Sequence, residues 1–312
     1  ARRAGREIVV TMATARDLSK PRAVALEGIE LVADPATIVA SPDIDIVVEL
    51  IGGETRAKEL VLAAIAGGKH VVTANKALLA RHGNEIFAAA HARGVMVAFE
   101  AAVAGGIPII KAIREGLSAN RIEYLMGIIN GTCNYILSEM RDKGLAFDVV
   151  LAEAQRLGYA EADPSFDIDG IDAAHKLTIL SAIAFGIPMQ FDKAYTEGIG
   201  KLTAADIKYA EGLGYRIKLL GIARRAAAGI ELRVHPTLVP ARRILANVEG
   251  VMNAVLVKGD AVGHTLFYGR GAGAEATASA VVADLVDVTR MATAAPTSTR
   301  SPRASWTRRS SR

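Results

Sequence analysis

The sequence predicts an α/β protein in which a parallel, doubly wound sheet is followed by a second α/β domain. In the first hundred residues, short runs of β-branched residues alternate with helical stretches, which is typical of βαβ units. From about residue 107 this alternation stops, and longer helices and successive strands follow. The 312 residues, 51% of them hydrophobic, suffice for two packed cores and exclude a disordered or collagen-like chain.

The first half divides into elements by its hydrophobic pattern and its glycines. Apolar, β-branched runs predict strands within residues 6–15, 41–53, the first half of 69–80, and 95–103. Amphipathic patterns predict helices at residues 55–68, in the second half of 69–80, and at 83–94. Ligands of such sheets bind beyond the carboxyl ends of the strands. A phosphate-binding crevice is therefore expected at Ala13–Arg16, Leu50–Gly53, Thr73–Lys76 and Glu100–Gly106.

The second half has a different order of elements. Its pattern predicts helices at residues 107–119, 146–157 and 169–185, and strands at 120–130, 217–226, 230–240 and 254–262. A glycine turn at 269–273 then leads into a helix that ends near residue 288. The expected domains are residues 1–104 with 265–289 for the dinucleotide, and residues 105–264 for substrate binding and dimerisation.

Composition excludes several classes of protein. The single cysteine, Cys133, excludes a disulfide scaffold and a multi-cysteine zinc site, and is consistent with a cytoplasmic protein. No apolar run is long enough to span a membrane, and the first residues do not resemble a signal peptide. Aromatic residues make up only 5%, so no nucleic-acid surface is expected.

The net charge of +4 comes from the end of the chain. Residues 290–312 contain six arginines and no acid, so removing them leaves a charge of −2 on residues 1–289. This segment is rich in Ser, Thr, Pro and Arg without apolar periodicity, which predicts a disordered basic tail.

Acidic residues are most concentrated in residues 158–176. The segment contains five carboxylates, followed by a histidine and a lysine: Glu161, Asp163, Asp167, Asp169, Asp172, His175 and Lys176. One interpretation is a solvated loop that caps a helix. A calcium loop is excluded because Lys176 falls where such a loop needs a glutamate. Asp172 and Lys176 share a helix face, where they can hold a proton donor beside a substrate oxygen.

Three further segments have both a structural and a functional interpretation. Lys76, just past a strand, either opens a helix or binds a carboxylate or acts in catalysis. Residues 100–110 form either a turn into a helix or a ring of backbone carbonyls around a monovalent cation. Residues 129–137 place small residues at a helix start, which suits a ligand carboxylate, with Cys133 as a packed residue.

Together these segments resemble the homoserine dehydrogenase family. The matching stretches occur in family order along residues 1–289 and read DIDIVVELIGG, VVTANKALLA, EAAVAGGIPII, INGTCNYIL, GYAEADPSFDIDGIDAAHKL and YGRGAGAEATASAVVADL. The resemblance implies a Rossmann-like first domain and a homodimer formed through the second domain. It also implies the NAD(P)H-dependent reduction of L-aspartate 4-semialdehyde to L-homoserine, in threonine and methionine biosynthesis.

The resemblance also implies roles for individual residues. Lys176 matches the family's proton donor, with Asp172 and Lys76 beside it in the catalytic group. The residues that match the substrate pocket are Glu161, Asp167, Tyr159, Gly131 and Thr132. The residues expected at the cofactor are Arg16, Gly52, Gly53, Thr73, Lys76, Gly271 and Gly273. The residues that match a sodium site are Glu100 through its carboxylate, and Val103, Gly105 and Ile107 through backbone oxygens.

The chain differs from the family pattern at both ends. The opening strand, glycine-rich turn and helix that bind the dinucleotide pyrophosphate are not seen, and no regulatory domain follows. The first domain is therefore expected to be incomplete at its N-terminus, in a truncated enzyme. An impaired remnant that keeps the substrate domain but binds cofactor poorly is the alternative.

Charge at the end of the strand predicted at residues 6–15, which corresponds to the second strand of the family pattern, indicates which cofactor is preferred. An NAD site usually has an acid there that binds the ribose 2′-hydroxyl, whereas Arg16 stands at this position with Lys20 and Arg22 close by. Guanidinium groups suit a 2′-phosphate. NADP(H) is therefore favoured over NAD(H), although Asp17 keeps NAD(H) open.

Overall fold

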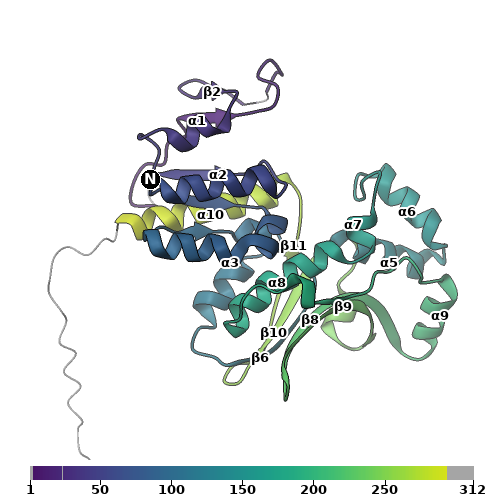
Figure 1. The fold of residues 1–312 in the computed structure, drawn as a ribbon. Coiled ribbons are helices and arrows are strands. Elements are labelled where there is room, and N and C mark those ends of the chain that lie inside the picture. Colours follow the sequence, from purple (N-terminus) through teal and green to yellow (C-terminus); the bar gives the residue numbers. More distant parts are fainter. Residues whose placement is uncertain (1–2, 23, 294–312) are drawn as a thin grey trace, which may run out of the picture.

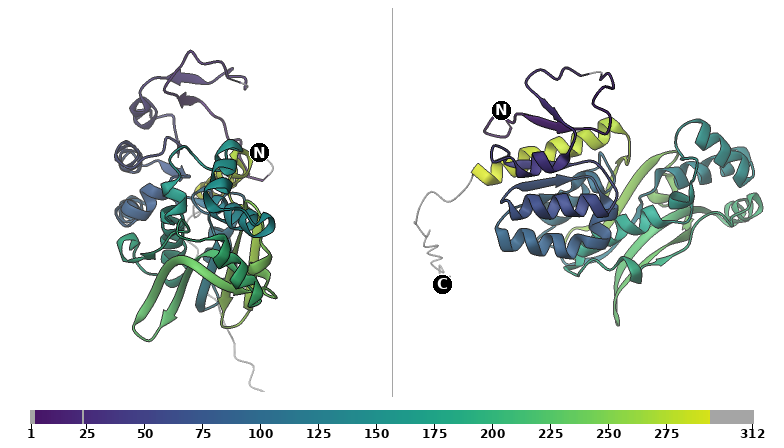
Figure 2. Two further views of the ribbon diagram at one scale, coloured as in Figure 1. Left: turned by 90° about the vertical axis from the view of Figure 1, so that its right-hand side faces the viewer. Right: turned by 45° about the horizontal axis from the view of Figure 1, so that its top comes forward.

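The computed structural model describes residues 3–22 and 24–293. The first domain contains a parallel three-stranded sheet in which β4 (His70–Thr73) lies between β3 (Ile46–Glu49) and β5 (Val97–Ala98). A separate parallel pair, β1 (Met12–Thr14) and β2 (Glu30–Val32), lies with α1 (Pro35–Ala40) to one side of this sheet (Figures 1 and 2). The expected α/β fold with a Rossmann-like domain is confirmed at this level.

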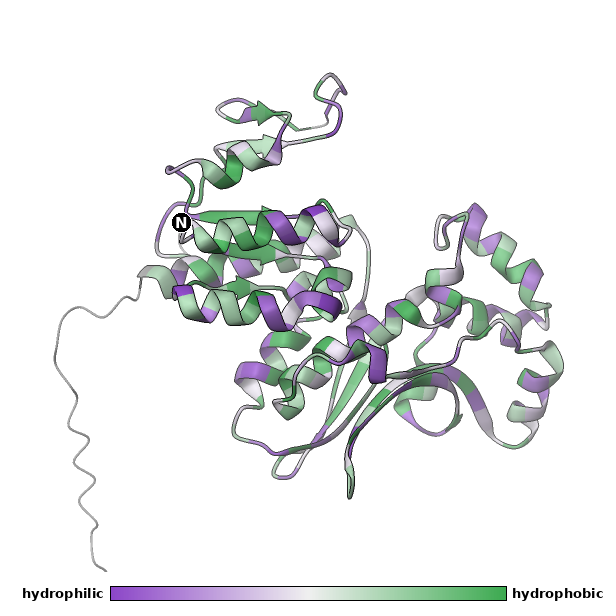
Figure 3. Cartoon of the chain, in the orientation of Figure 1, coloured by the Kyte–Doolittle hydropathy of each residue, from purple (hydrophilic) through white to green (hydrophobic). Residues whose placement is uncertain are grey.

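Helices cover both faces of the three-stranded sheet. Val71 of β4 packs with α2 (Thr55–Ala66) and α3 (Lys76–Arg93), whereas its neighbour Val72 packs with α10 (Ala274–Thr293). Because successive side chains of a strand point to opposite faces, α10 lies across the sheet from α2 and α3. A helix that follows the second domain in sequence thus packs in the first domain, whose strands are mainly hydrophobic in Figure 3.

The second domain is built on a six-stranded sheet with the order β11-β10-β6-β8-β9-β7. Its strands are β6 (Ile122–Ile128), β7 (Tyr195–Thr196), β8 (Tyr215–Ala226), β9 (Gly229–Pro240), β10 (Met252–Gly259) and β11 (Gly263–Arg270). All neighbours are antiparallel except β7 and β9. One face packs on α5 (Gly131–Lys143) and α8 (Ile171–Phe185), and the other packs on η4 (Ile244–Asn247).

The remaining helices are short or peripheral. They are η1 (Glu100–Ala102), α4 (Ile109–Lys111), the π-turn η2 (Ala112–Gly116), α6 (Phe147–Arg156), α7 (Ser165–Ile168), η3 (Phe191–Lys193) and α9 (Ala204–Gly212). No helix in the described ranges has the length and hydropathy needed to cross a membrane.

The strand predicted at 6–15 is wrong in extent, because only Met12–Thr14 is a strand. The apolar run before it is exposed, with 64% of Val9 and 57% of Val10 accessible to solvent. β-Branched residues form a strand only where a neighbouring strand and a packed face receive them. These residues have neither among the described elements, so intrinsic propensity does not decide their structure.

The two helices predicted across residues 76–94 are one continuous helix, α3. Gly83 lies in its middle, and a Cβ placed on Gly83 would come 3.2 Å from the sulfur of Met189. Glycine therefore serves here as a close-packing residue and does not break the helix. The predicted helix at 107–119 is also wrong in form, since one short α-helical turn passes into a π-turn.

Two predicted boundaries require correction. The division at residue 264 cuts β11, which pairs with β10 along its whole length and therefore belongs to the second sheet. The tail predicted from residue 290 begins too early, because α10 continues to Thr293. The rest of the predicted basic tail, residues 294–312, lies outside the described residues.

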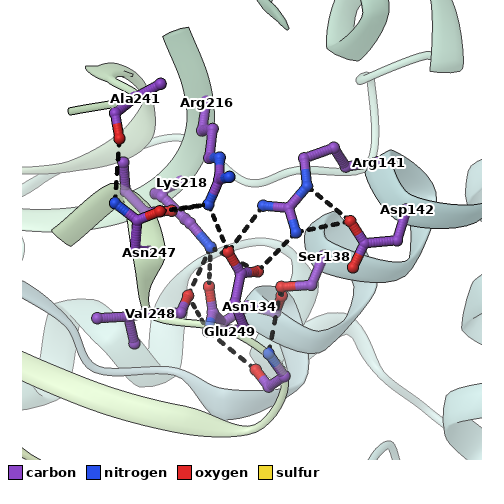
Figure 4. Close-up of polar contacts among 12 residues, drawn as sticks. Asn134, Ser138, Arg141, Asp142, Arg216, Lys218, Ala241, Asn247, Val248 and Glu249 are labelled. Carbon is purple, nitrogen blue, oxygen red and sulfur yellow. Dashed lines mark hydrogen bonds and ion pairs between the residues drawn. The ribbon is translucent and has the colours of Figure 1, made fainter. Parts of the chain in front are cut away.

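A partly buried polar network fixes α5 to the second sheet (Figure 4). Glu249 accepts hydrogen bonds from Arg141 of α5 at 2.9 Å and from Arg216 of β8 at 2.7 Å. Lys218, which is 1% exposed, donates to the side chain of Asn134 and to the carbonyl of Val248. These bonds fix the helix whose first residues line the site described next.

Candidate active site

Asp172 is the centre of the polar site between the two domains. Its carboxylate, on the first turn of α8, lies 2.7 Å from Nζ of Lys176 and 3.2 Å from Nζ of Lys76. Asn130 donates a further hydrogen bond to it at 2.9 Å. Burial acts to raise the pKa of Asp172, but the two lysines and these hydrogen bonds outweigh burial and lower that pKa. The carboxylate therefore stays charged.

Lys176 is held with its ammonium group directed by two acceptors. Nζ donates to the Asp172 carboxylate and, at 2.8 Å, to the backbone carbonyl of Ile129. A lysine ammonium carries three protons, so these two bonds leave one for a ligand oxygen. Only 11% of the side chain is exposed, which keeps the group largely out of bulk water.

Lys76 comes to this site from the first domain. It is the first residue of α3, whose start is capped by Asn75, because the side chain of Asn75 accepts from the backbone N–H of Leu78. A third of the Lys76 side chain is exposed. The cap and the ion pair with Asp172 place a cation of the first domain beside the carboxylate of the second.

The start of α5 forms the opposite wall of the site. Asn130 caps this helix through its side-chain oxygen and donates from its side-chain nitrogen to both Asp167 and Asp172, at 2.6 and 2.9 Å. Burial raises the pKa of Asp167. A Cβ on Gly131 would come 2.8 Å from the carbonyl of Val251, so only glycine fits there. The sequence analysis expected a helix start within residues 129–137 but missed the role of Asn130 in joining the two acids.

Other residues of the predicted pocket lie further out. The hydroxyl of Thr132 donates to the carbonyl of Tyr159, whose ring packs edge to face on Tyr135. The side chain of Glu161 is exposed, and the structure does not bring it into contact with Asp172 or Lys176. Cys133 is buried, and burial raises its pKa well above the usual value, as expected of a packed thiol.

A cleft of about 640 Å³ lies at the carboxyl ends of β3 and β4, beside the start of α10. Its lining residues are Leu50, Gly52, Ala74, Asn75, Gly273, Ala274, Thr277, Ala278, Val281 and Val282. Two predicted cofactor residues, Gly52 and Gly273, line it. The residues of α10 were missed, although a glycine turn followed by small residues at a helix start marks them.

Other predicted cofactor residues have different positions. Thr73 is fully buried, and its hydroxyl donates to Glu49. The carbonyl of Gly53 accepts from Asn75, while Arg16 is exposed after β1 and does not line the cleft. Gly271 packs on Asn253 below the glycine turn. Thr73 and Gly271 therefore do not line the cleft but contact residues packed behind its lining.

The buried acid Glu49 was missed by the sequence analysis. One of its oxygens accepts from the backbone N–H groups of Ile51 and Gly52, and the other accepts from Thr73. It is only 4% exposed. An acid in an apolar strand just before a glycine pair is the signal that marks it. Its bonds fix the loop that lines the cleft.

Glu100 begins η1, shortly after β5, and is 3% exposed. Its carboxylate accepts from the backbone N–H groups of Ile110 and Lys111, and burial raises its pKa to about 6. Asp284 accepts from the backbone N–H of Glu100, and burial also raises the pKa of Asp284 to about 6. The described ranges hold no cluster of three or more His, Cys, Asp or Glu side chains suited to a metal. A cation here would therefore need backbone oxygens as its other ligands.

Comparison with known proteins identifies the family. Residues 108–286 match the family model described as homoserine dehydrogenase, and residues 1–100 match the homoserine dehydrogenase NAD binding domain. Homoserine dehydrogenase of Pseudomonas aeruginosa is 69% identical over 297 residues, covering 95% of this chain and 68% of the relative. The Neisseria gonorrhoeae relative is 64% identical over 93% of this chain and 66% of its own length.

Solved structures agree with this result. A homoserine dehydrogenase from Thiobacillus denitrificans superposes with a TM-score of 0.91 at 74% identity, covering 94% of this chain and 68% of that one. A hyperthermophilic archaeal homoserine dehydrogenase in complex with NADPH superposes with a TM-score of 0.72 at 30% identity, covering 82% and 75%. This chain spans about two thirds of the length of the relatives it matches. By sequence and by structure, the chain belongs to the homoserine dehydrogenase family.

Proposed function

We propose that this chain catalyses the NAD(P)H-dependent reduction of L-aspartate 4-semialdehyde to L-homoserine, with Lys176 as the proton donor. The observation that carries the proposal is the ion-paired set of Lys176, Asp172 and Lys76, in which Asp172 is buried, next to a cleft of about 640 Å³. The lining of the cleft fits the cofactor, because glycines and a helix start allow close approach to phosphate and ribose. When bound, the nicotinamide would supply the hydride.

The charges of the site match the chemistry of an aldehyde being reduced. The carbonyl oxygen becomes negative as the carbon accepts hydride, and the remaining N–H of Lys176 can neutralise it and pass on its proton. Asp172 directs Lys176 by its 2.7 Å bond. Lys76 forms a second ion pair with Asp172 and partly balances its negative charge. The carboxylate therefore attracts the proton of Lys176 less strongly, and this proton can pass to the substrate oxygen.

The substrate pocket follows from the same set. We propose that the substrate's amino acid end lies toward the start of α5, near Gly131 and Thr132, with Asp167 and Tyr159 beside it. Glu161 would receive the substrate ammonium group. The Glu161 side chain is exposed, so its carboxylate is accessible to a ligand.

Removal of the lysine tests the proposal. Lys176→Ala should lower kcat by roughly 10²–10⁴-fold, the usual contribution of general acid catalysis, and should leave NADPH affinity nearly unchanged. The assay follows NADPH oxidation with aspartate semialdehyde. The matched control is Lys143→Ala, which removes a half-exposed lysine at the far end of α5. A loss of less than about tenfold would exclude the role of Lys176.

NADP(H) is proposed as the preferred cofactor. The support is Arg16 beside Lys20 and Arg22, and the NADPH named for the archaeal relative. Arg16→Ala should therefore reduce affinity for NADPH more than affinity for NADH, because only NADPH carries a 2′-phosphate. Isothermal titration of both cofactors measures this and also tests the alternative of an impaired remnant that binds cofactor poorly. Equal losses would mean that Arg16 does not bind that phosphate.

A sodium ion and a homodimer complete the proposal. Glu100, with the backbone oxygens of Val103, Gly105 and Ile107, supplies hard oxygen donors around one buried carboxylate, and sodium titration of activity would test this site. The sheet face opposite α8 carries exposed Tyr268, and Ile244 of η4 on the same side is also exposed, which suits contact with a second copy. A monomeric mass by light scattering would contradict the dimer.

A further inference from the structure

His175 is a buried group that the proposed reaction does not use. It lies three residues after Asp172, so these two side chains are neighbours on α8, and it directly precedes Lys176 in the sequence. The residue is 2% exposed. Its ring lies edge to face against Phe166 of α7 at 5.4 Å between centroids, and against Phe191 of η3 at 4.4 Å.

The surroundings of His175 favour a neutral ring. Burial is the main cause that lowers its pKa to about 4, and Arg81 lowers it further. Neither ring nitrogen has a hydrogen-bond partner in the described part of the chain. An imidazole without partners, packed between two phenyl rings, interacts with its neighbours as an aromatic surface.

Each of the two phenyl rings also receives a cation from the first domain. Nζ of Lys76 lies 5.6 Å from the centroid of Phe166, and the guanidinium of Arg81 lies 5.0 Å from the centroid of Phe191. Both cations belong to α3, whereas His175 and the two phenylalanines belong to the second domain. The three rings therefore form an aromatic bridge that connects α3 to α8, and one of its ends lies under Lys76.

We propose that His175 is a positioning residue of the reductase site, which acts through Phe166 to hold Lys76 at Asp172. This inference rests on the proposed function, because it assigns a role within the same site. The ring of His175 fixes Phe166 from behind, and the face of Phe166 supports the ammonium of Lys76 that pairs with Asp172. On the other side of the His175 ring, Phe191 contacts the guanidinium of Arg81 and so adds a second contact between the aromatic bridge and α3. Loss of the central ring should loosen both contacts between the domains.

Two substitutions separate the ring from its nitrogens. His175→Phe keeps an aromatic ring without polar atoms, and His175→Gln keeps polar atoms without a ring. We expect His175→Phe to retain kcat and KM, whereas His175→Gln should lower kcat/KM by about tenfold, the combined size of an aromatic pair and a cation–π contact. The loss should fall on both kcat and KM, because Lys76 contacts the catalytic carboxylate. The reverse pattern, with Gln active and Phe impaired, would overturn the proposal, as would two fully active variants.

His235 offers a matched control in the same chain. Its ring also lies edge to face on an aromatic ring, Tyr195, at 6.3 Å between centroids, on β9 outside the site. His235→Phe and His235→Gln should leave the kinetics unchanged. If His175→Gln fails to fold, Phe166→Leu removes the ring under Lys76 while His175 remains, and it should show the same loss. A fully active Phe166→Leu variant would overturn the proposal.

A second measurement does not depend on turnover. Hydrogen exchange should be faster in His175→Gln than in wild type at the backbone amides of Leu78–Arg81 on α3, and unchanged in the middle of α5. If wild type does not reduce aspartate semialdehyde, the proposed function fails, but the exchange result still decides whether His175 holds α3. Unchanged exchange at Leu78–Arg81 would overturn the positioning role.

Discussion

At the scale of single residues, the site is defined by one buried carboxylate between two lysines. A buried charge is costly unless it is paired and hydrogen-bonded. Asp172 is paired with Lys176 and Lys76 and is bonded by Asn130. The net charge of the three ionic groups is positive, which favours the negative oxygen that forms during reduction.

Glu161 supplies a prediction at the same scale. Glu161→Gln should raise KM for homoserine with little change in kcat, because an amide loses the charge that attracts the substrate ammonium but does not touch the reacting carbon. Steady-state kinetics in the oxidation direction measures this. Asp163→Asn is a suitable control, since this nearby carboxylate is bound to Ser165. A KM within about twofold of wild type would exclude Glu161 from the pocket.

At the scale of elements, the site depends on how helices begin. α3 begins at Lys76 behind the Asn75 cap, and α5 begins at Gly131 behind the Asn130 cap. Each cap residue also makes a tertiary bond, from Asn75 to Gly53 and from Asn130 to Asp172. One side chain therefore sets both the start of a helix and its position at the site.

The glycine turn before α10 gives a prediction for Gly271. A Cβ at this position would come 2.0 Å from the side-chain nitrogen of Asn253, a residue that is 1% exposed. Gly271→Ala should therefore destabilise the fold by about 1–3 kcal/mol through overpacking and should weaken NADPH binding at the neighbouring Gly273.

Thermal unfolding and cofactor titration measure the two effects. Gly200→Ala is the control, because nothing lies within 4 Å of a Cβ built there. Combining Gly271→Ala with Asn253→Ser should recover part of the stability by making room. Unchanged stability and affinity in Gly271→Ala alone would mean that the turn adapts without cost.

At the scale of the whole molecule, the two domains meet through α3 and α8, and a partly buried polar network stabilises the second domain away from that contact. Lys218 lies at the centre of this network. Burial lowers its pKa from 10.5 to about 8. Between these two values the folded chain binds fewer protons than the unfolded chain, so the contribution of Lys218 to stability rises with pH in this window.

Lys218→Met should remove that pH dependence. The difference in unfolding free energy between wild type and variant should shift in favour of wild type as pH rises from about 8 to 10.5, by at most about 1.4 kcal/mol per pH unit. Urea unfolding at several pH values measures it, with Lys208→Met on exposed α9 as the control. A difference that stays flat across this range would show that Lys218 keeps its proton.

The amino-acid sequence by itself determined those helices and strands whose stabilising contacts are made between residues close together in the sequence. The four-residue spacing of Asp172 and Lys176 places both on one helix face, and the helix start predicted within residues 129–137 is where α5 begins. The family also followed from the sequence, because its motifs occur in order along the chain.

Only the tertiary structure decided which distant groups meet. Lys76 reaches Asp172 across 96 positions, Glu49 bonds Thr73, and β11 joins the second sheet. The apolar run at Ile8–Val10 is not a strand, and Gly83 does not end a helix. The physical reason is the same in each case. Hydrogen-bond partners and packed faces supplied by remote segments outweigh local propensity, and no pattern within a few residues encodes them.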